Sequence, residues 1–279
     1  MDAMKKKLVQ FNAEILNSDD AKDSEYKDFA IEDAADLDDL FGILSDQSTW
    51  HVAKFPQYCC DLFEHKLLRW PTAKILPVLD MLRMFMLHQD AVDLLITNNQ
   101  AIRELITGHI ANDEECTAAM QMIVSRLLSN YLAKRKRGDL ERTQNQYPAE
   151  ILEFLQEALS LMSAAATNEK SSVHTAYIML AHNTLIWFGK FKVEESDIYL
   201  IVISAMFELM TELELNDKIL YYCLSLIGTC AWASESAKAS IVEIFDDQLK
   251  GIVNKAKHSV GSAACREVGN DLWNMFEMS

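Results

Sequence analysis

Residues 67–87, LLRWPTAKILPVLDMLRMFML, contain the clearest structural pattern in this chain. From Ile75 onward, apolar residues recur at spacings of three and four, which predicts an amphipathic helix with a broad apolar face. Trp70 and Pro71 form a helix-start signal, because proline suits the first helical turn and has no donor to lose there. Pro77 leaves two starts open, a bent first turn after Pro71 or a helix that restarts at Pro77.

The same spacing recurs along most of the chain. Helix-length apolar patterns occupy residues 4–16, 29–46, 50–68, 90–106, 114–132, 148–166, 170–189, 194–213, 216–234, 236–254 and 259–277. Asp90 is the expected cap of the fourth of these segments. No segment shows two-residue alternation bounded by hairpin turns, and 8 glycines and 4 prolines in 279 residues favour long helices. The sequence therefore predicts an all-α protein.

Polar residues interrupt the most apolar helices at a nearly regular period. They are Arg83, Arg126, Asn183, Gly228 and Asn270, separated by 43, 57, 45 and 42 residues. Three of the four separations match the period of about 40–47 residues in HEAT and armadillo arrays. The pattern predicts an armadillo/HEAT-like α-solenoid with an extended concave binding surface.

The composition and charge of the chain restrict the classes of molecule that it is expected to bind. Half of the residues are apolar, the net charge is −16, and residues 1–50 carry half of that charge. The acidic balance disfavours nucleic acid, although a basic site on the remaining chain is compatible with it. No run approaches about 18 apolar residues and no secretory leader is evident, so we expect an intracellular, cytoplasmic protein without a membrane span. Lys134–Gly138 is either a nuclear-import signal or, the favoured reading, a basic helix end.

No motif for catalysis, metal or cofactor is present. Phosphate loops, a G-x-S-x-G elbow and H-E-x-x-H are all absent, and the six cysteines form no C-x-x-C. A cysteine hydrolase using Cys60 or Cys230 is the enzymatic alternative, and it is disfavoured because nothing in the sequence activates either thiol. His174 and His182 lack carboxylates at ligand spacing. We expect no enzyme, no metal and no cofactor.

Arg126, Asn130 and Asn183 are polar residues within apolar helices. A guanidinium there either pairs internally or faces a groove, and an amide offers both a donor and an acceptor for the backbone of an extended peptide. The alternative, that each satisfies a buried backbone group, is equally favoured for each residue alone.

These residues belong to a set of motifs that resemble, in the same order, those of a known family. LPVLDMLR at 76–83 resembles the F-P-x-L-D-x-L-R signature of the PUL domain, the C-terminal module of phospholipase A2-activating protein and its relatives. Arg126 and Asn130 resemble that family's L-R-x-x-x-N helix. Further similar segments are His174 with Asn183, Leu226–Thr229, and Cys265-Arg266 with the apolar run that follows.

The resemblance implies a fold and a partner. The fold is an armadillo-like array of about six helical repeats over residues 67–279, with residues 1–66 as an N-terminal helical extension carrying the acidic segment. The partner is the acidic C-terminal tail of the valosin-containing AAA+ ATPase, in ubiquitin-dependent protein handling, bound by a monomer. The implied peptide-binding residues are Arg126, Asn130, Asn183, Arg83, His174, Tyr222 and Arg266.

Two departures limit the resemblance. The family usually has arginine where this chain has Tyr222, and its members carry an upstream β-propeller and ubiquitin-binding module for which this chain has no room. The chain is thus a fragment or a PUL-only protein, and ubiquitin binding is not implied. The competing interpretation is an α-solenoid scaffold for a different peptide or helical partner, a basic one if the acidic surface attracts it.

Overall fold

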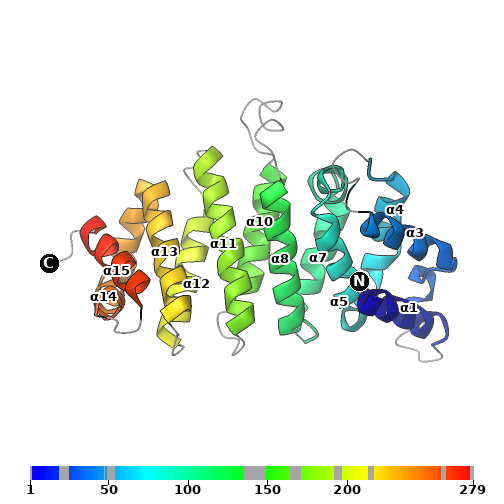
Figure 1. The fold of residues 1–279 in the computed structure, drawn as a ribbon, viewed down its shortest axis with the longest axis horizontal. Coiled ribbons are helices and arrows are strands. Elements are labelled where there is room, and N and C mark those ends of the chain that lie inside the picture. Colours follow the sequence, from blue (N-terminus) through cyan, green and yellow to red (C-terminus); the bar gives the residue numbers. More distant parts are fainter. Residues whose placement is uncertain are drawn as a thin grey trace. The chain divides into compact units, whose positions relative to one another are not determined.

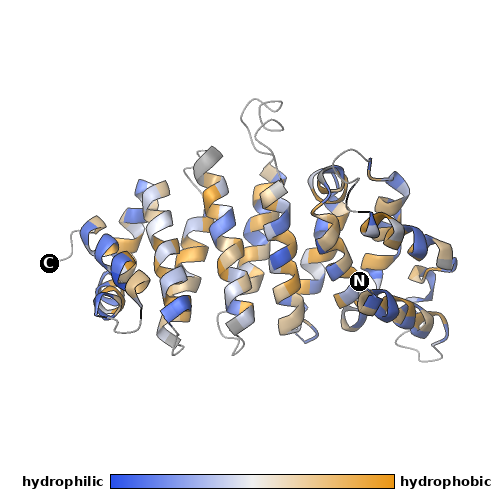
Figure 2. Ribbon diagram, in the orientation of Figure 1, coloured by the Kyte–Doolittle hydropathy of each residue, from blue (hydrophilic) through white to orange (hydrophobic). Residues whose placement is uncertain are grey.

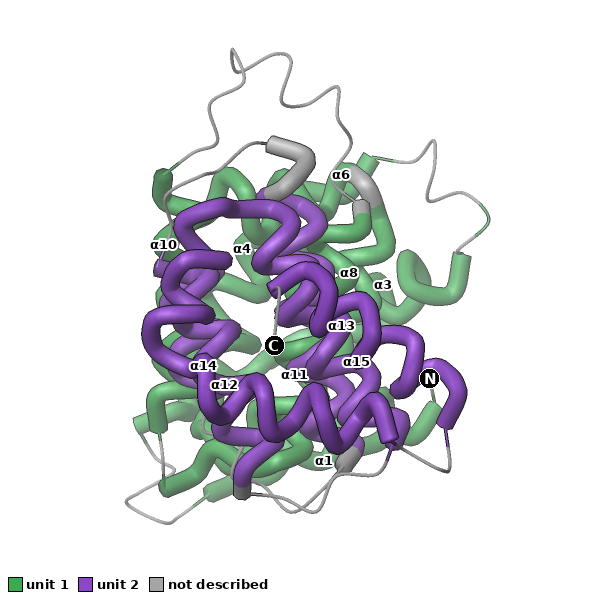
Figure 3. The backbone as a smooth tube through the Cα atoms, turned by 90° about the vertical axis from the view of Figure 1, so that its left-hand side faces the viewer, with its two compact units in different colours: residues 1–154 green, residues 155–279 purple. Residues whose placement is uncertain are grey.

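The computed structural model describes residues 2–18, 25–46, 48, 54–112, 114–134, 149–163, 171–191, 197–212, 217–258 and 262–276. The chain divides into two compact units, Met1–Phe154 and Leu155–Ser279, coloured separately in Figure 3. Within those described ranges, every regular element is helical and no β-strand occurs. Neighbouring helices pack against one another within each unit. The predicted all-α class and α-solenoid architecture are confirmed.

Unit 1 contains helices that range from 4 residues in α6 to 17 residues in α8 (Figure 1). Its α-helices are α1 (Asp2–Leu16), α3 (Ala34–Ser45), α4 (Gln57–His65), α5 (Leu76–Phe85), α6 (Gln89–Val92), α7 (Gln100–Ile110) and α8 (Ala118–Lys134), with 3-10 turns at Lys27–Phe29, Leu67–Arg69 and Thr72–Lys74. Helix α10 (Ala149–Ser163) begins in unit 1 and continues into unit 2. Most of the basic run at 134–138 lies outside the described residues.

The helix predicted within residues 67–87 is α5, and it restarts at Pro77. Pro71 instead lies between two 3-10 turns. Of the two expected starts, the restart at Pro77 is therefore correct, and the bent first turn after Pro71 is not. Most of the helix is buried, with Arg83 and Asp80 half-buried at its edge. α5 packs against α8 on one side and α1 on another, which makes it the centre of unit 1.

The continuous helix expected over residues 90–106 is wrong. Instead, α6 ends at Val92, a π-helical segment covers Asp93–Thr97, and α7 starts after a break. Asp90 caps neither helix. Its carboxylate accepts a hydrogen bond from the Phe55 backbone N–H at 2.8 Å, which ties α6 to the segment before α4.

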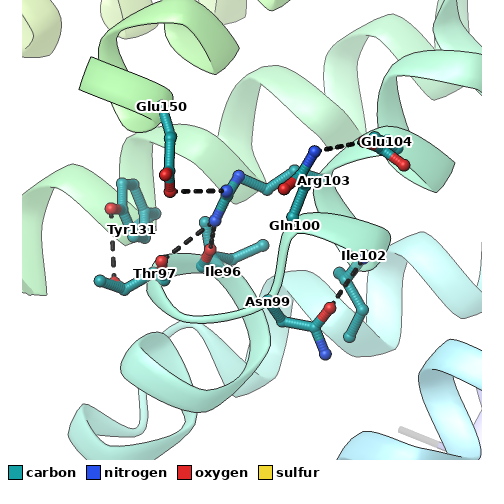
Figure 4. Close-up of polar contacts among 9 residues, drawn as sticks. All are labelled: Ile96, Thr97, Asn99, Gln100, Ile102, Arg103, Glu104, Tyr131 and Glu150. Atoms are coloured by element: carbon teal, nitrogen blue, oxygen red, sulfur yellow. Dashed lines mark hydrogen bonds and ion pairs between the residues drawn. The ribbon is translucent and has the colours of Figure 1, made fainter. Parts of the chain in front are cut away.

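A buried arginine stabilises this break. The Arg103 side chain, on α7, is 5% exposed as a residue, and its Nη1 donates to the carbonyl oxygens of Ile96 and Thr97 at 2.7 and 3.0 Å. Its Nη2 lies 3.6 Å from the carboxylate of Glu150 on α10 (Figure 4). The guanidinium thus satisfies carbonyls that the interrupted helix leaves without intrahelical donors.

Unit 2 has two layers of longer helices. Besides the remainder of α10, it contains α11 (Ser171–Phe191), α12 (Asp197–Glu212), α13 (Asp217–Ala233), α14 (Glu235–Lys257) and α15 (Ala263–Met275). α11, α13 and α15 pack in succession as one layer, and α12 and α14 pack together as the second. These bounds follow the predicted segments closely.

The core of each unit comes from the amphipathic pattern. Figure 2 shows apolar and polar residues together on the long helices. The largest fully buried side chains include Trp70, Tyr131 and Phe63 in unit 1 and Tyr177 and Phe188 in unit 2. Across the described part of the chain, no helix has both the length and the hydropathy needed to cross a membrane.

Candidate functional site

Arg126 is an exposed cation on α8. It lies on α8 between buried neighbours, Val124 on one side and Leu127 on the other, and its own side chain faces outward. Within the described ranges it makes no hydrogen bond, ion pair or ring contact. The guanidinium therefore keeps all five of its donors for an external acceptor.

Asn130 lies one turn further along α8 and joins that helix to α5. Its Nδ2 donates to the backbone carbonyl of Arg83 at 3.1 Å. Of the two roles expected for this amide, the structure thus shows the satisfaction of a backbone group. The bond also fixes Asn130 beside the end of α5.

The two arginines of unit 1 differ in their charge balance. Arg83 Nε donates to Asp80 Oδ1 at 2.7 Å, so these two residues, three apart on α5, form an ion pair. Asp80 offsets the positive charge of Arg83, whereas Arg126 has no such partner among the described residues. We name Arg83, Arg126 and Asn130 the Arg126 surface. Its attraction for an anion comes mainly from Arg126.

Unit 2 contains the other four candidates on the successive helices of one layer. Asn183 on α11, Tyr222 on α13 and Arg266 on α15 are half-buried. His174, also on α11, is 4% exposed. Its ring is therefore buried within this unit, and its contact with a peptide stays a prediction.

Lys218 is a cation that the sequence interpretation missed. It is exposed on α13, one turn before Tyr222, and its Nζ lies 5.9 Å from the centroid of the Tyr222 ring. The two aromatic rings of Tyr221 and Tyr222 are themselves 5.6 Å apart. The helix thus carries a positive charge beside the position where the resemblance leads one to expect arginine. The four-residue spacing of Lys218 and Tyr222 could have revealed it.

The cysteines are poor candidates for nucleophiles. Burial raises the pKa of the Cys60 thiol to about 12, and it also raises the pKa of Cys230. Both thiols therefore stay protonated near neutral pH, and it is the thiolate that attacks. Cys265 Sγ donates to the Asp217 carbonyl at 2.8 Å, a structural contact between α15 and α13. The described residues contain no His, Cys, Asp and Glu group able to hold a metal ion.

Comparison with known proteins assigns the fold to a family. The family model described as the PUL domain matches residues 1–271. The match covers all of unit 1 and residues 155–271 of unit 2, and it includes all seven candidate residues. No curated protein matches the chain.

Proposed function

Because this chain belongs to the PUL domain family, which consists of protein-interaction domains, we propose that it is a non-enzymatic adaptor. Its partner is the acidic C-terminal tail of the valosin-containing AAA+ ATPase, bound during ubiquitin-dependent protein handling in the cytoplasm or nucleus. The family membership supports the binding role, and the residues of the Arg126 surface support the acidic chemistry of the ligand.

One observation carries the proposal: Arg126 is exposed and has no carboxylate partner in the described part of a chain with a net charge of −16. An arginine without an acidic neighbour is a suitable site for a carboxylate, because its planar fork can form two parallel charge-assisted hydrogen bonds. The half-buried amide of Asn130 lies one turn away and can contact the peptide backbone.

Unit 2 supplies a second set of groups with the same chemistry. Lys218 adds a positive charge next to Tyr222, whose hydroxyl can donate to a carboxylate. Asn183 on the neighbouring helix α11 offers a further amide. In this proposal the ligand is an extended acidic peptide, and these residues recognise its side chains and backbone.

The test is a fluorescence-anisotropy titration of a labelled tail peptide against wild type and Arg126→Ala. Losing one charge-assisted contact costs about 1.5–3 kcal/mol, so affinity should fall roughly ten- to hundredfold. The melting temperature should change little, because Arg126 contacts no described side chain through a hydrogen bond or ion pair.

The matched control is Lys54→Ala, which removes one exposed positive charge elsewhere in unit 1. It should leave the affinity close to that of wild type. An Arg126→Ala variant that melts several degrees earlier and binds the peptide normally would make Arg126 a structural residue. Equal losses in both variants would mean that the peptide senses overall charge and not the Arg126 surface.

A further inference from the structure

A cleft of about 420 Å³ lies between α13 and α15 in unit 2. Its lining includes Gly228 and Trp232 on α13 and Glu267, Asp271, Leu272 and Met275 on α15, and we name it the Trp232 cleft. Small residues on α13 create this space. At Gly228 an added Cβ would lie 3.1 Å from Leu272 Cδ2, so a larger residue here would crowd the Leu272 side chain.

Trp232 presents an aromatic surface at this cleft. It is 80% exposed, whereas Trp70 and Trp187 are almost completely buried. An indole left in water forgoes a large favourable burial, and such rings commonly mark binding surfaces. The exposed indole provides a flat, electron-rich face for a ligand.

Two carboxylates on α15 complete the site. Glu267 and Asp271 are one helical turn apart, both exposed and both lining the cleft. Neither forms a hydrogen bond or ion pair with another described residue. Their negative charge is therefore uncompensated next to the indole, and a cation is the complementary ligand.

Helix α15 already carries a contact between a cation and a tryptophan ring. Lys257 Nζ, at the end of α14, lies 3.7 Å from the centroid of the Trp273 ring on α15. The Lys257 ammonium lies over the Trp273 ring, whereas the Trp232 ring has no such cation among the described residues. The Trp232 cleft thus combines an available ring with two available carboxylates.

We propose that the Trp232 cleft binds the arginine side chain of a protein partner. The planar guanidinium stacks on Trp232 and donates to Glu267 and Asp271, and its aliphatic stem lies against Leu272 and Met275. Arginine suits the site better than lysine, because it stacks on aromatic faces and bonds carboxylates bidentately. This ligand has the opposite charge to the acidic tail, so the inference does not depend on the proposed function.

The experiment uses the full chain and the pentapeptide acetyl-Gly-Gly-Arg-Gly-Gly-amide. Its readout is the indole N–H signal of Trp232 in a proton–nitrogen correlation spectrum, assigned by its disappearance in Trp232→Phe. The signal should shift saturably with the arginine peptide. It should shift far less with the citrulline peptide, which has nearly the same shape without the charge. A lysine peptide should bind more weakly than the arginine peptide.

Matched charge variants locate the binding. Glu267→Gln with Asp271→Asn should lower the affinity at least about tenfold. The control, Glu243→Gln with Asp247→Asn, removes the same two acid types at the same spacing from exposed positions of α14 and should bind like wild type. For the peptides, the inference would be overturned by the absence of a saturable shift, by equal shifts with the citrulline peptide, or by tighter binding of the lysine peptide. For the variants, it would be overturned by unchanged binding in Glu267→Gln with Asp271→Asn, or by equal losses of affinity in that variant and the control.

Discussion

His109 shows how a single buried side chain holds unit 1 together. Its Nε2 lies 2.8 Å from the carbonyl of Leu68, and its Nδ1 lies 2.9 Å from the Thr72 hydroxyl. Because a carbonyl only accepts, Nε2 carries the proton and Nδ1 accepts from Thr72. The neutral ring thus bridges α7 to the 3-10 turns at Leu67–Arg69 and Thr72–Lys74. Burial lowers the pKa of His109 from its ordinary value of 6.5.

This lowered pKa predicts a loss of stability in mild acid. The unfolded chain binds the proton more readily than the folded chain, so the free energy of unfolding is largest above about pH 6.5 and decreases below it. The melting temperature followed by circular dichroism should fall between about pH 7.5 and 5.5. In His109→Gln this fall should be smaller, while His65→Gln, at an exposed histidine, should behave as wild type. An unchanged fall in His109→Gln would contradict the assignment.

Residue spacing predicted some of the site and missed the rest. Helical spacing places Asp80 within reach of Arg83, but it left open whether Arg126 pairs internally or faces outward, and the structure shows that Arg126 is exposed. The burial of His174 was not predicted, because nearly every side of α11 is apolar and its pattern does not single out an exposed face. The Trp232 cleft was not predicted because Trp232 on α13 and Glu267 on α15 are 35 residues apart in the sequence, and only the packing of α13 on α15 brings them together.

At the scale of elements, α15 is positioned by a close approach at Gly269. A Cβ at this residue would lie 3.0 Å from the backbone nitrogen of Lys257 and 3.3 Å from Ala256 Cβ, both on α14. The nearest obstacle is backbone, which cannot move aside as a flexible side chain can. The absence of a side chain at Gly269 therefore allows the last two helices to pack, and with them the α15 wall of the Trp232 cleft.

Gly269→Ala should destabilise the fold by about 1–3 kcal/mol, the usual cost of overpacking. Gly251→Ala on α14 is the matched control, because nothing lies within 4 Å of its Cβ. Alanine is the better helix former, so this control should gain up to about 1 kcal/mol. Urea unfolding measures both variants. A stabilised Gly269→Ala would show that α14 and α15 are not in close contact at this point.

Helix prediction succeeded where local signals suffice. α10 to α14 begin and end within a few residues of the predicted segments, and Ser234 caps α14 through its hydroxyl as serine commonly does. α15 begins four residues later than expected, because Ser262 is its N-cap. The break before α7 had a local signal that the prediction did not use: Asn99 is the N-cap of α7, and its side chain accepts from the Ile102 backbone N–H. Arg103, by contrast, becomes informative only when its carbonyl partners are known.

For the whole molecule, the domain boundary expected at residue 67 stays a prediction. α1 packs on α5, and the Asn12 amide forms two hydrogen bonds of 2.7 Å with the backbone N–H and carbonyl of Ile31. These contacts attach the N-terminal helix to the rest of unit 1. The family match also begins at residue 1.

The proposed ligand, an acidic peptide, has the same sign of charge as the chain, whose net charge is −16. At long range the chain repels an acidic peptide, so any preference for acid must come from local cations such as Arg126 and Lys218. Screening at physiological salt confines interactions between exposed charges to about 8 Å, which favours such local contacts over the total charge. A preference of this chain for an acidic peptide would therefore indicate binding by local cations and not by the overall charge.

The most direct measurement compares the labelled acidic tail peptide with a twin whose Asp and Glu are replaced by Asn and Gln. Both are titrated against the full chain by fluorescence anisotropy at physiological salt. We expect saturable binding of the acidic peptide and at least about tenfold weaker binding of its neutral twin, since each charge-assisted contact contributes roughly 1.5–3 kcal/mol. Equal binding of the two peptides, preference for the neutral twin, or no binding of the acidic tail would contradict it.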